Sequence, residues 1–231
     1  MEQTCFPAGI HPAVDDVMST LTITDPNPFR AARAPGARAL YDALKAVPLS
    51  RAVTSPEAMP VVTAPADELA PVFDHIGRGE RAAGPAFPRG ATFADGRLDM
   101  CKQVVGPEFI GGLTAAVRRG GAATGIEHFL IGNNVVGDGG AREIAAMLCD
   151  AGAPRLKTLY LAGNALGPKG AWALSDALAG DRSVRSLWLK RNPIGPEGGA
   201  AIGALLARNA TIETLDLVNT GLLDEGVEAV F

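Results

Sequence analysis

One pattern recurs four times in the second half of the chain and limits the possible folds more than any other feature. The copies begin at Ile126, Leu156, Val184 and Ile212, which are 30, 28 and 28 residues apart. Each reads apolar-x-x-apolar-x-apolar, and three residues after the last apolar position comes Asn, or Thr in the last copy. Repetition at a fixed period of this size predicts a solenoid, because each unit can bury its apolar side only against its neighbours.

Two periodicities follow each other within every unit. Apolar residues first alternate with other residues, as in Leu159 and Leu161, which predicts a short strand with these side chains inside. A period near 3.6 follows, as in Gly170, Leu174 and Leu178, and this predicts a helix. A glycine near the start of each helix would let it approach its neighbours closely.

A polar residue comes three positions after each predicted strand core, at Asn134, Asn164, Asn192 and Thr220. We expect these side chains to point inward and to bond the backbone of the turn, where sheet partners run out. An earlier unit with a weaker pattern begins at Arg97 and has Gln103 at this place. The sequence therefore predicts about five units, with an atypical first unit of the kind found at solenoid ends.

These units resemble leucine-rich repeats of the ribonuclease-inhibitor type, including the Gly-Ala-Leu-rich repeats of bacterial proteins, as in residues 203–207. The resemblance covers residues 97–231. It implies an α/β fold: a right-handed, horseshoe-like arc with parallel strands on the concave face and helices on the convex face. Such proteins mostly bind other proteins, but the repeat motif specifies the scaffold and carries over no contact residue. An Arg-rich, Ala/Gly-rich composition also suggests a bacterial source.

The first 96 residues have a different character. Most of the 17 prolines lie there, and they interrupt all but short helical patterns near residues 13–21, 37–47 and 66–76. We expect residues 1–96 to form an irregular, Pro-rich segment, part of which caps the open end of the repeat domain at residues 97–231. A tail that does not pack against the repeats is the alternative.

Charge and sequence spacing argue against several classes of protein. The net charge of −4 disfavours nucleic acid as the main partner. There is no apolar run of membrane-spanning length and no secretory signal at the start of the sequence. We therefore expect a cytoplasmic protein with reduced thiols at Cys5, Cys101 and Cys149, and secretion without a signal peptide stays an alternative. No metal-ligand spacing or cofactor fingerprint occurs, so neither group is expected.

The residues that alternate with the buried ones should form the outer face of the predicted sheet. Its central row would be Asp99, Leu130, Tyr160, Trp188 and Asp216. Neighbouring apolar and aromatic side chains next to cations are typical of protein-binding surfaces. We therefore expect the protein-binding site to contain Leu130, Tyr160, Trp188, Lys190, Arg191, Asp216 and His128.

Three further points concern the surfaces of the molecule. The N-terminal segment could cover the aromatic residues, which would then be ordinary internal packing. Trp172 is expected to face solvent on the helix side and would offer a second contact. The sequence ends at Phe231 within the helix of the fifth unit, so we expect the natural chain to continue beyond it. The alternative is that another surface covers this edge, for example by self-association.

The main prediction is a non-enzymatic protein-binding module. The sequence has no G-x-S-x-G, H-E-x-x-H, Walker A or Rossmann fingerprint. One alternative is a substrate-recruiting arm of a larger enzyme or effector, such as a ubiquitin-ligase adaptor. Another is a structural repeat that self-associates.

Overall fold

The computed structural model describes residues 63–80 and 86–231. The predicted helices near residues 13–21 and 37–47 lie outside these ranges. The elements are α5 (Ala66–Gly77), β1 (Ala91–Thr92), β2 (Arg97–Asp99), α6 (Gly106–Gly120), η2 (Gly121–Thr124), β3 (His128–Leu130), α7 (Gly137–Leu148), β4 (Thr158–Tyr160), α8 (Pro168–Ala179), β5 (Ser186–Trp188), α9 (Gly195–Leu206), β6 (Thr214–Asp216) and α10 (Leu223–Val230). Within the described ranges, no helix combines the length and hydropathy needed to cross a membrane.

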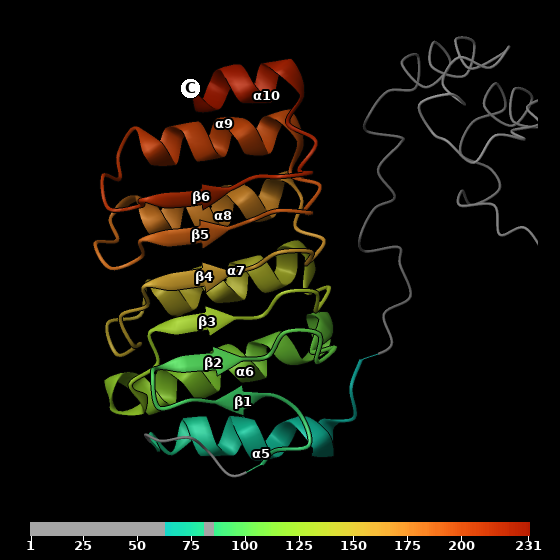
Figure 1. The fold of residues 1–231 in the computed structure, drawn as a ribbon, viewed down its shortest axis with the longest axis vertical. Helices are drawn as coiled ribbons and strands as arrows, with labels where there is room; N and C mark the ends of the chain where they lie inside the picture. The colour runs from blue at the N-terminus through green and yellow to red at the C-terminus, as the bar shows by residue number, and fades with distance from the viewer. Residues whose placement is uncertain (1–62, 81–85) are drawn as a thin grey trace, which may run out of the picture. The chain divides into compact units, whose positions relative to one another are not determined.

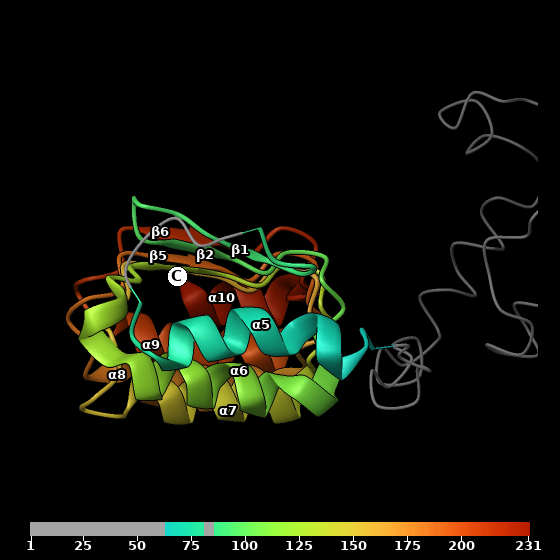
Figure 2. The same cartoon turned by 90° about the horizontal axis from the view of Figure 1, so that it is seen from below.

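The strands form one sheet in the order β1-β2-β3-β4-β5-β6. Strands β2 to β6 are parallel, and β1 is antiparallel to β2. The helices form a second layer on one side of this sheet, and each stacks on the helix of the next unit (Figures 1 and 2). The predicted α/β solenoid of stacked strand–turn–helix units is therefore confirmed.

The core lies between the two layers and follows the predicted alternation. Strand residues such as Phe129, Leu159 and Leu187 are fully buried and pair in register across the sheet. Helix residues such as Leu174 and Ile202 close the core from the other side. The sheet and helix layers each bury one face against the other, which neither could do alone.

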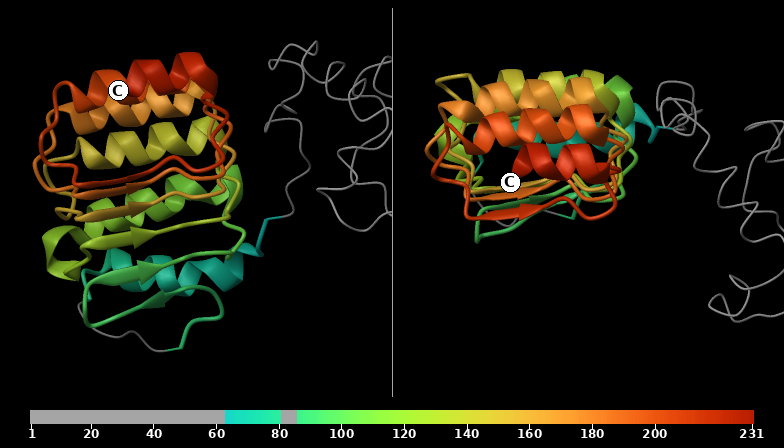
Figure 3. Two further views of the ribbon diagram at one scale, coloured as in Figure 1. Left: turned by 45° about the horizontal axis from the view of Figure 1, so that its top comes forward. Right: turned by 90° about the horizontal axis from the view of Figure 1, so that it is seen from above.

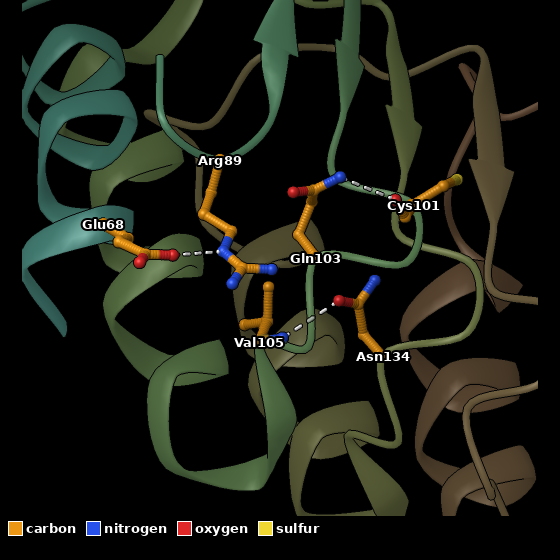
Figure 4. Close-up of polar contacts among 6 residues, drawn as sticks. All are labelled: Glu68, Arg89, Cys101, Gln103, Val105 and Asn134. Carbon is orange, nitrogen blue, oxygen red and sulfur yellow. Dashed lines mark hydrogen bonds and ion pairs between the residues drawn. The ribbon is translucent and has the colours of Figure 1, made fainter. Parts of the chain in front are cut away.

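The asparagines bond their own turn, as predicted, and also the neighbouring units. The side chain of Asn134 donates to Ile131 O at 2.8 Å and to Met100 O of the preceding unit at 2.7 Å. Its Oδ1 accepts from Val105 N at 3.0 Å (Figure 4). Asn164 and Asn192 repeat this arrangement, with all three side chains fully buried. The result is a ladder of amides that ties successive turns together.

The ladder is weaker in both end units. Gln103 Nε2 donates to Cys101 O at 3.0 Å, within its own turn (Figure 4). Thr220 Oγ1 donates to Leu217 O at 2.6 Å. The hydroxyl thus replaces the bond that each asparagine makes within its own turn. The first turn nevertheless has the common geometry, because Lys102 has a φ of 61°, close to the 57° of Asn133 in the next unit.

Glycine near the helix start permits close helix packing, as expected. A Cβ at Gly170 would lie 2.6 Å from Asp138 Oδ1 and 3.0 Å from the Cβ of Ala141, both on α7. The carboxylate of Asp138 uses this closeness: its Oδ1 accepts from Gly167 N at 2.7 Å and from Gly170 N at 2.9 Å. One unit thus caps the helix of the next, a contact that the sequence did not suggest.

Two elements from before residue 97 cover the first unit. Helix α5 buries Leu69, Val72 and Ile76 against α6, and β1 extends the sheet. Arg89 and Glu68 form an ion pair at 2.7 Å that ties the segment before β1 to α5 (Figure 4). A solenoid cap needs contacts of this kind, and the assignment of these elements as a cap stays a prediction. The division of the chain at residue 97 stays a prediction, since the described elements on its two sides pack together in one compact unit.

Candidate protein-binding face

The outward side of β2 to β6, called the strand face below, presents the predicted rows of side chains. The parallel strands lie side by side on one side of the molecule (Figure 3). Their register makes neighbours of the central-row residues Asp99, Leu130, Tyr160, Trp188 and Asp216. The predicted row is therefore confirmed as a geometric feature, and its role in binding stays a prediction.

The two aromatic side chains at the centre of this row touch. The ring centroids of Tyr160 and Trp188 are 5.9 Å apart with the planes tilted by 45°. Both residues, like Leu130 beside them, are half-buried and therefore reach solvent from a rigid strand. The Tyr160 ring lies over Gly132, where a Cβ would come within 2.5 Å of ring atom Cε1. The repeat pattern did not predict this support of the ring.

Lys190 lies over the two aromatic rings and forms an ion pair with Asp216. The ammonium of Lys190 lies 5.1 Å from the Trp188 ring centroid and 5.7 Å from that of Tyr160. It also lies 3.4 Å from Asp216 Oδ2, and the two side chains are 29% and 16% exposed. Asp216 Oδ1 accepts from Val218 N at 3.0 Å, so the carboxylate has partners on both oxygens. These contacts hold the cation against the ring faces.

The remaining two predicted residues lie at the margins of this group. His128 is in the flanking row at the start of the strands, where its Nδ1 is 2.9 Å from Thr158 Oγ1. Arg191 follows Lys190 in the turn after β5, is exposed, and makes no ion pair within the described residues. The structure thus gathers Leu130, Tyr160, Trp188, Lys190 and Asp216 and leaves the other two at the edges.

Other candidate chemistry is sparse in the part of the chain that the structure describes. There, no group of three or more His, Cys, Asp or Glu residues could hold a metal ion. Burial raises the pKa of the Cys101 thiol to about 11, which disfavours the nucleophilic thiolate. A pocket of about 510 Å³ lies by the loops after α7 and α8, where Cys149 and Arg182 line it. None of the predicted contact residues reaches it.

On the helix side, Trp172 of α8 is 42% exposed, as predicted for its place after the helix-start glycine. It belongs to the opposite layer from the strand face (Figure 2). It therefore provides a control for experiments on the strand-face aromatics.

Comparison with known proteins agrees with this architecture. A family model described as a leucine-rich repeat matches residues 154–175, 180–203 and 208–231. Among solved structures, the actin-binding site 2 of leiomodin-1 is similar, with a TM-score of 0.52 and 20% sequence identity over 71% of this chain and 92% of that one. At this identity the similarity shows the fold alone. No curated protein matches the sequence.

The stacked strand–turn–helix units and their buried amide ladder define a parallel α/β solenoid. Together with the three matched repeats, they give this part of the chain the fold of a leucine-rich repeat domain. The ribonuclease-inhibitor type and the bacterial source stay predictions.

Proposed function

We propose that this protein is a non-enzymatic binding module that holds a protein partner on its strand face, chiefly through Tyr160 and Trp188. The observation that carries the proposal is the contact between these two half-buried rings on neighbouring strands, next to Lys190. Leucine-rich repeat domains generally serve as protein-interaction modules. The similar leiomodin-1 structure is an actin-binding site of that protein, which supports a protein partner as a class and does not identify actin as the partner here.

The physical argument rests on rigidity and on the nature of the rings. Tyr and Trp offer large apolar areas with a polar atom at one end, and they are frequent anchors at interfaces. Here both are mounted on paired strands and packed on each other, and the Tyr160 ring is seated on Gly132. Side chains that are already ordered lose little conformational entropy when a partner binds.

The test is affinity capture with the full chain, followed by measurement of the dissociation constant for the captured partner. Tyr160→Ala and Trp188→Ala are each expected to cost roughly 1–4 kcal/mol of binding free energy. Trp172→Ala is the matched control and should bind as tightly as the wild type. Unchanged affinity in both strand-face variants would contradict the proposal.

The same variants separate binding from internal packing. If the N-terminal segment covered the rings, Trp188→Ala would lower the thermal stability of the full chain and leave partner binding intact or stronger. If the surface is instead open to a partner, Trp188→Ala should weaken partner binding and leave the thermal stability near that of the wild type. Thermal unfolding of Trp188→Ala beside Trp172→Ala distinguishes the two.

Self-association and a role as a substrate-recruiting arm stay predictions. In the last unit, Val218 follows β6 and is 61% exposed, while Val227 in α10 and Phe231 after it are 46% and 99% exposed. Mass measured over a concentration series would detect a dimer formed through these residues, and Val227→Asp should then abolish it.

A further inference from the structure

Charges are distributed unequally between the two ends of the strands. The turns that follow the strands, at residues 101–106, 132–137, 162–167, 190–195 and 218–223, contain Lys102, Lys190 and Arg191 and no acidic residue. Both Lys102 and Arg191 are exposed and make no ion pair within the described residues. This rim of the strand face therefore carries an excess of positive charge.

The opposite rim, where the strands begin, is balanced by its own ion pairs. Lys157 Nζ lies 2.7 Å from Glu127 Oε2, and Arg185 pairs with Glu213. Arg97 at the start of β2 is likewise paired with Asp95, at 2.7 Å. Exposed pairs of this kind contribute little to stability, but they leave little charge for a partner to recognise.

The acidic side chains of the strand face are also occupied within the protein. Asp216 accepts from Val218 N and faces Lys190, and Asp99 Oδ1 accepts from Cys101 N at 2.9 Å. The row between the aromatic residues and the balanced rim holds the hydroxyl residues Thr158 and Ser186. Crossing the face along a strand, a partner would meet neutral polar groups, then the aromatic pair, and then cations.

We propose that the partner is an acidic protein segment that places an apolar side chain on Tyr160 and Trp188 and a carboxylate beside Lys190 and Arg191. This inference rests on the proposed function and specifies the chemistry of the partner. Arg191 supplies an unpaired charge, while the ammonium of Lys190 is already held at the edge of the aromatic pair. Charge complementarity of this kind selects partners and speeds their association more than it adds affinity.

Nucleic acid would also offer negative charge and flat rings, but this face suits it poorly. Asp99 and Asp216 stand at the two ends of the central row. A continuous phosphate backbone that crossed the strands would pass both carboxylates, and the chain as a whole carries a net charge of −4. Separate carboxylates on a peptide can avoid these two positions.

The test is selection from a phage-displayed library of random peptides on the chain of 231 residues. Peptides that need Trp188 for binding should share an aliphatic or aromatic residue with a nearby Asp or Glu. For a synthetic peptide of this kind, the double variant K190Q/R191Q should bind roughly tenfold more weakly and with a smaller dependence on salt. K190E/R191E should instead select peptides that contain Lys or Arg.

The control is K169Q/R142Q, which removes the same charge from two exposed residues on the helix side and should leave the selected peptides unchanged. Trp188-dependent peptides that are basic or uncharged would overturn the inference and leave the proposed function standing. The absence of Trp188-dependent peptides would contradict both. An oligothymidine could instead bind more tightly than the acidic peptide and lose this binding in Trp188→Ala. That result would overturn the choice of a protein segment as the partner.

Discussion

The backbone N–H of Asn134 donates to the side-chain oxygen of Asn164, 30 residues further along the chain, at 3.0 Å. The Nδ2 of Asn164 in turn donates to Ile131 O and Leu161 O, at 2.9 and 3.0 Å. A single buried amide therefore serves two consecutive turns. Its contribution to stability comes from backbone groups that would otherwise be buried without a partner.

Asn164→Ala should remove these bonds and leave a buried N–H and parts of two carbonyls unsatisfied. We expect the free energy of unfolding to fall by roughly 2–4 kcal/mol, measured by urea denaturation. Ser186→Ala, on the outward side of β5, is the control and should change it by less than about 0.5 kcal/mol. A similar small change in Asn164→Ala would show that water or relaxation replaces the ladder.

Thr220→Asn should extend the same ladder by one step. By analogy with Asn192, the new amide would donate to Leu217 O and to Leu189 O, and its oxygen would accept from Asn192 N. We expect a gain of about 1 kcal/mol in the free energy of unfolding. Urea denaturation beside the wild type measures it, and a loss of stability would argue that the turn after β6 differs from the others.

Gly203→Ala tests the close contact between α9 and α10. A Cβ at Gly203 would overlap the backbone oxygen of Ala229, so one helix must move away. We expect a loss of about 1–3 kcal/mol, with faster hydrogen exchange in Leu223–Val230 than elsewhere. Gly180→Ala is the control, because a Cβ there meets nothing within 4 Å and φ is −97°. Equal effects of the two changes would contradict close packing at Gly203.

Gly132→Ala should disturb the aromatic pair without changing its residues. The added methyl group would push the Tyr160 ring away from Gly132 and alter its contact with Trp188. In a Trp172→Phe background, Trp188 fluorescence should change, and affinity for a Trp188-dependent peptide should fall roughly three- to tenfold. The unfolding midpoint should stay near that of the background protein. Unchanged fluorescence and affinity would show that the ring position is unimportant.

The Cys101 thiol should be slow to alkylate. Its pKa is raised to about 11, mainly because burial disfavours the thiolate, with the Asp99 carboxylate adding to the effect. At pH 8, iodoacetamide should therefore modify the exposed Cys149 well before Cys101, as followed by peptide mass spectrometry. The rate at Cys101 should rise about tenfold per pH unit between pH 8 and 10. Equal rates at pH 8 would contradict the raised pKa.

The repeat pattern was sufficient to predict the strands, their register and the side of the sheet on which each residue lies. In-phase copies align equivalent residues in neighbouring units, and alternation within a strand then separates Leu159 from Tyr160. The third helical pattern, near residues 66–76, was also correct and corresponds to α5. The pattern did not predict that β1 would add an antiparallel strand, because two residues carry almost no periodicity.

By itself, the sequence determined a stack of like units with Leu130, Tyr160 and Trp188 in one outward row, because a period of 28 to 30 residues and an alternation of two leave no other consistent arrangement. Only the tertiary structure decided which side chains meet across units, such as Asp138 with the start of α8 and Tyr160 with Gly132. Those contacts depend on rotamers and on the spacing and tilt of adjacent units, and a repeat motif specifies neither of them.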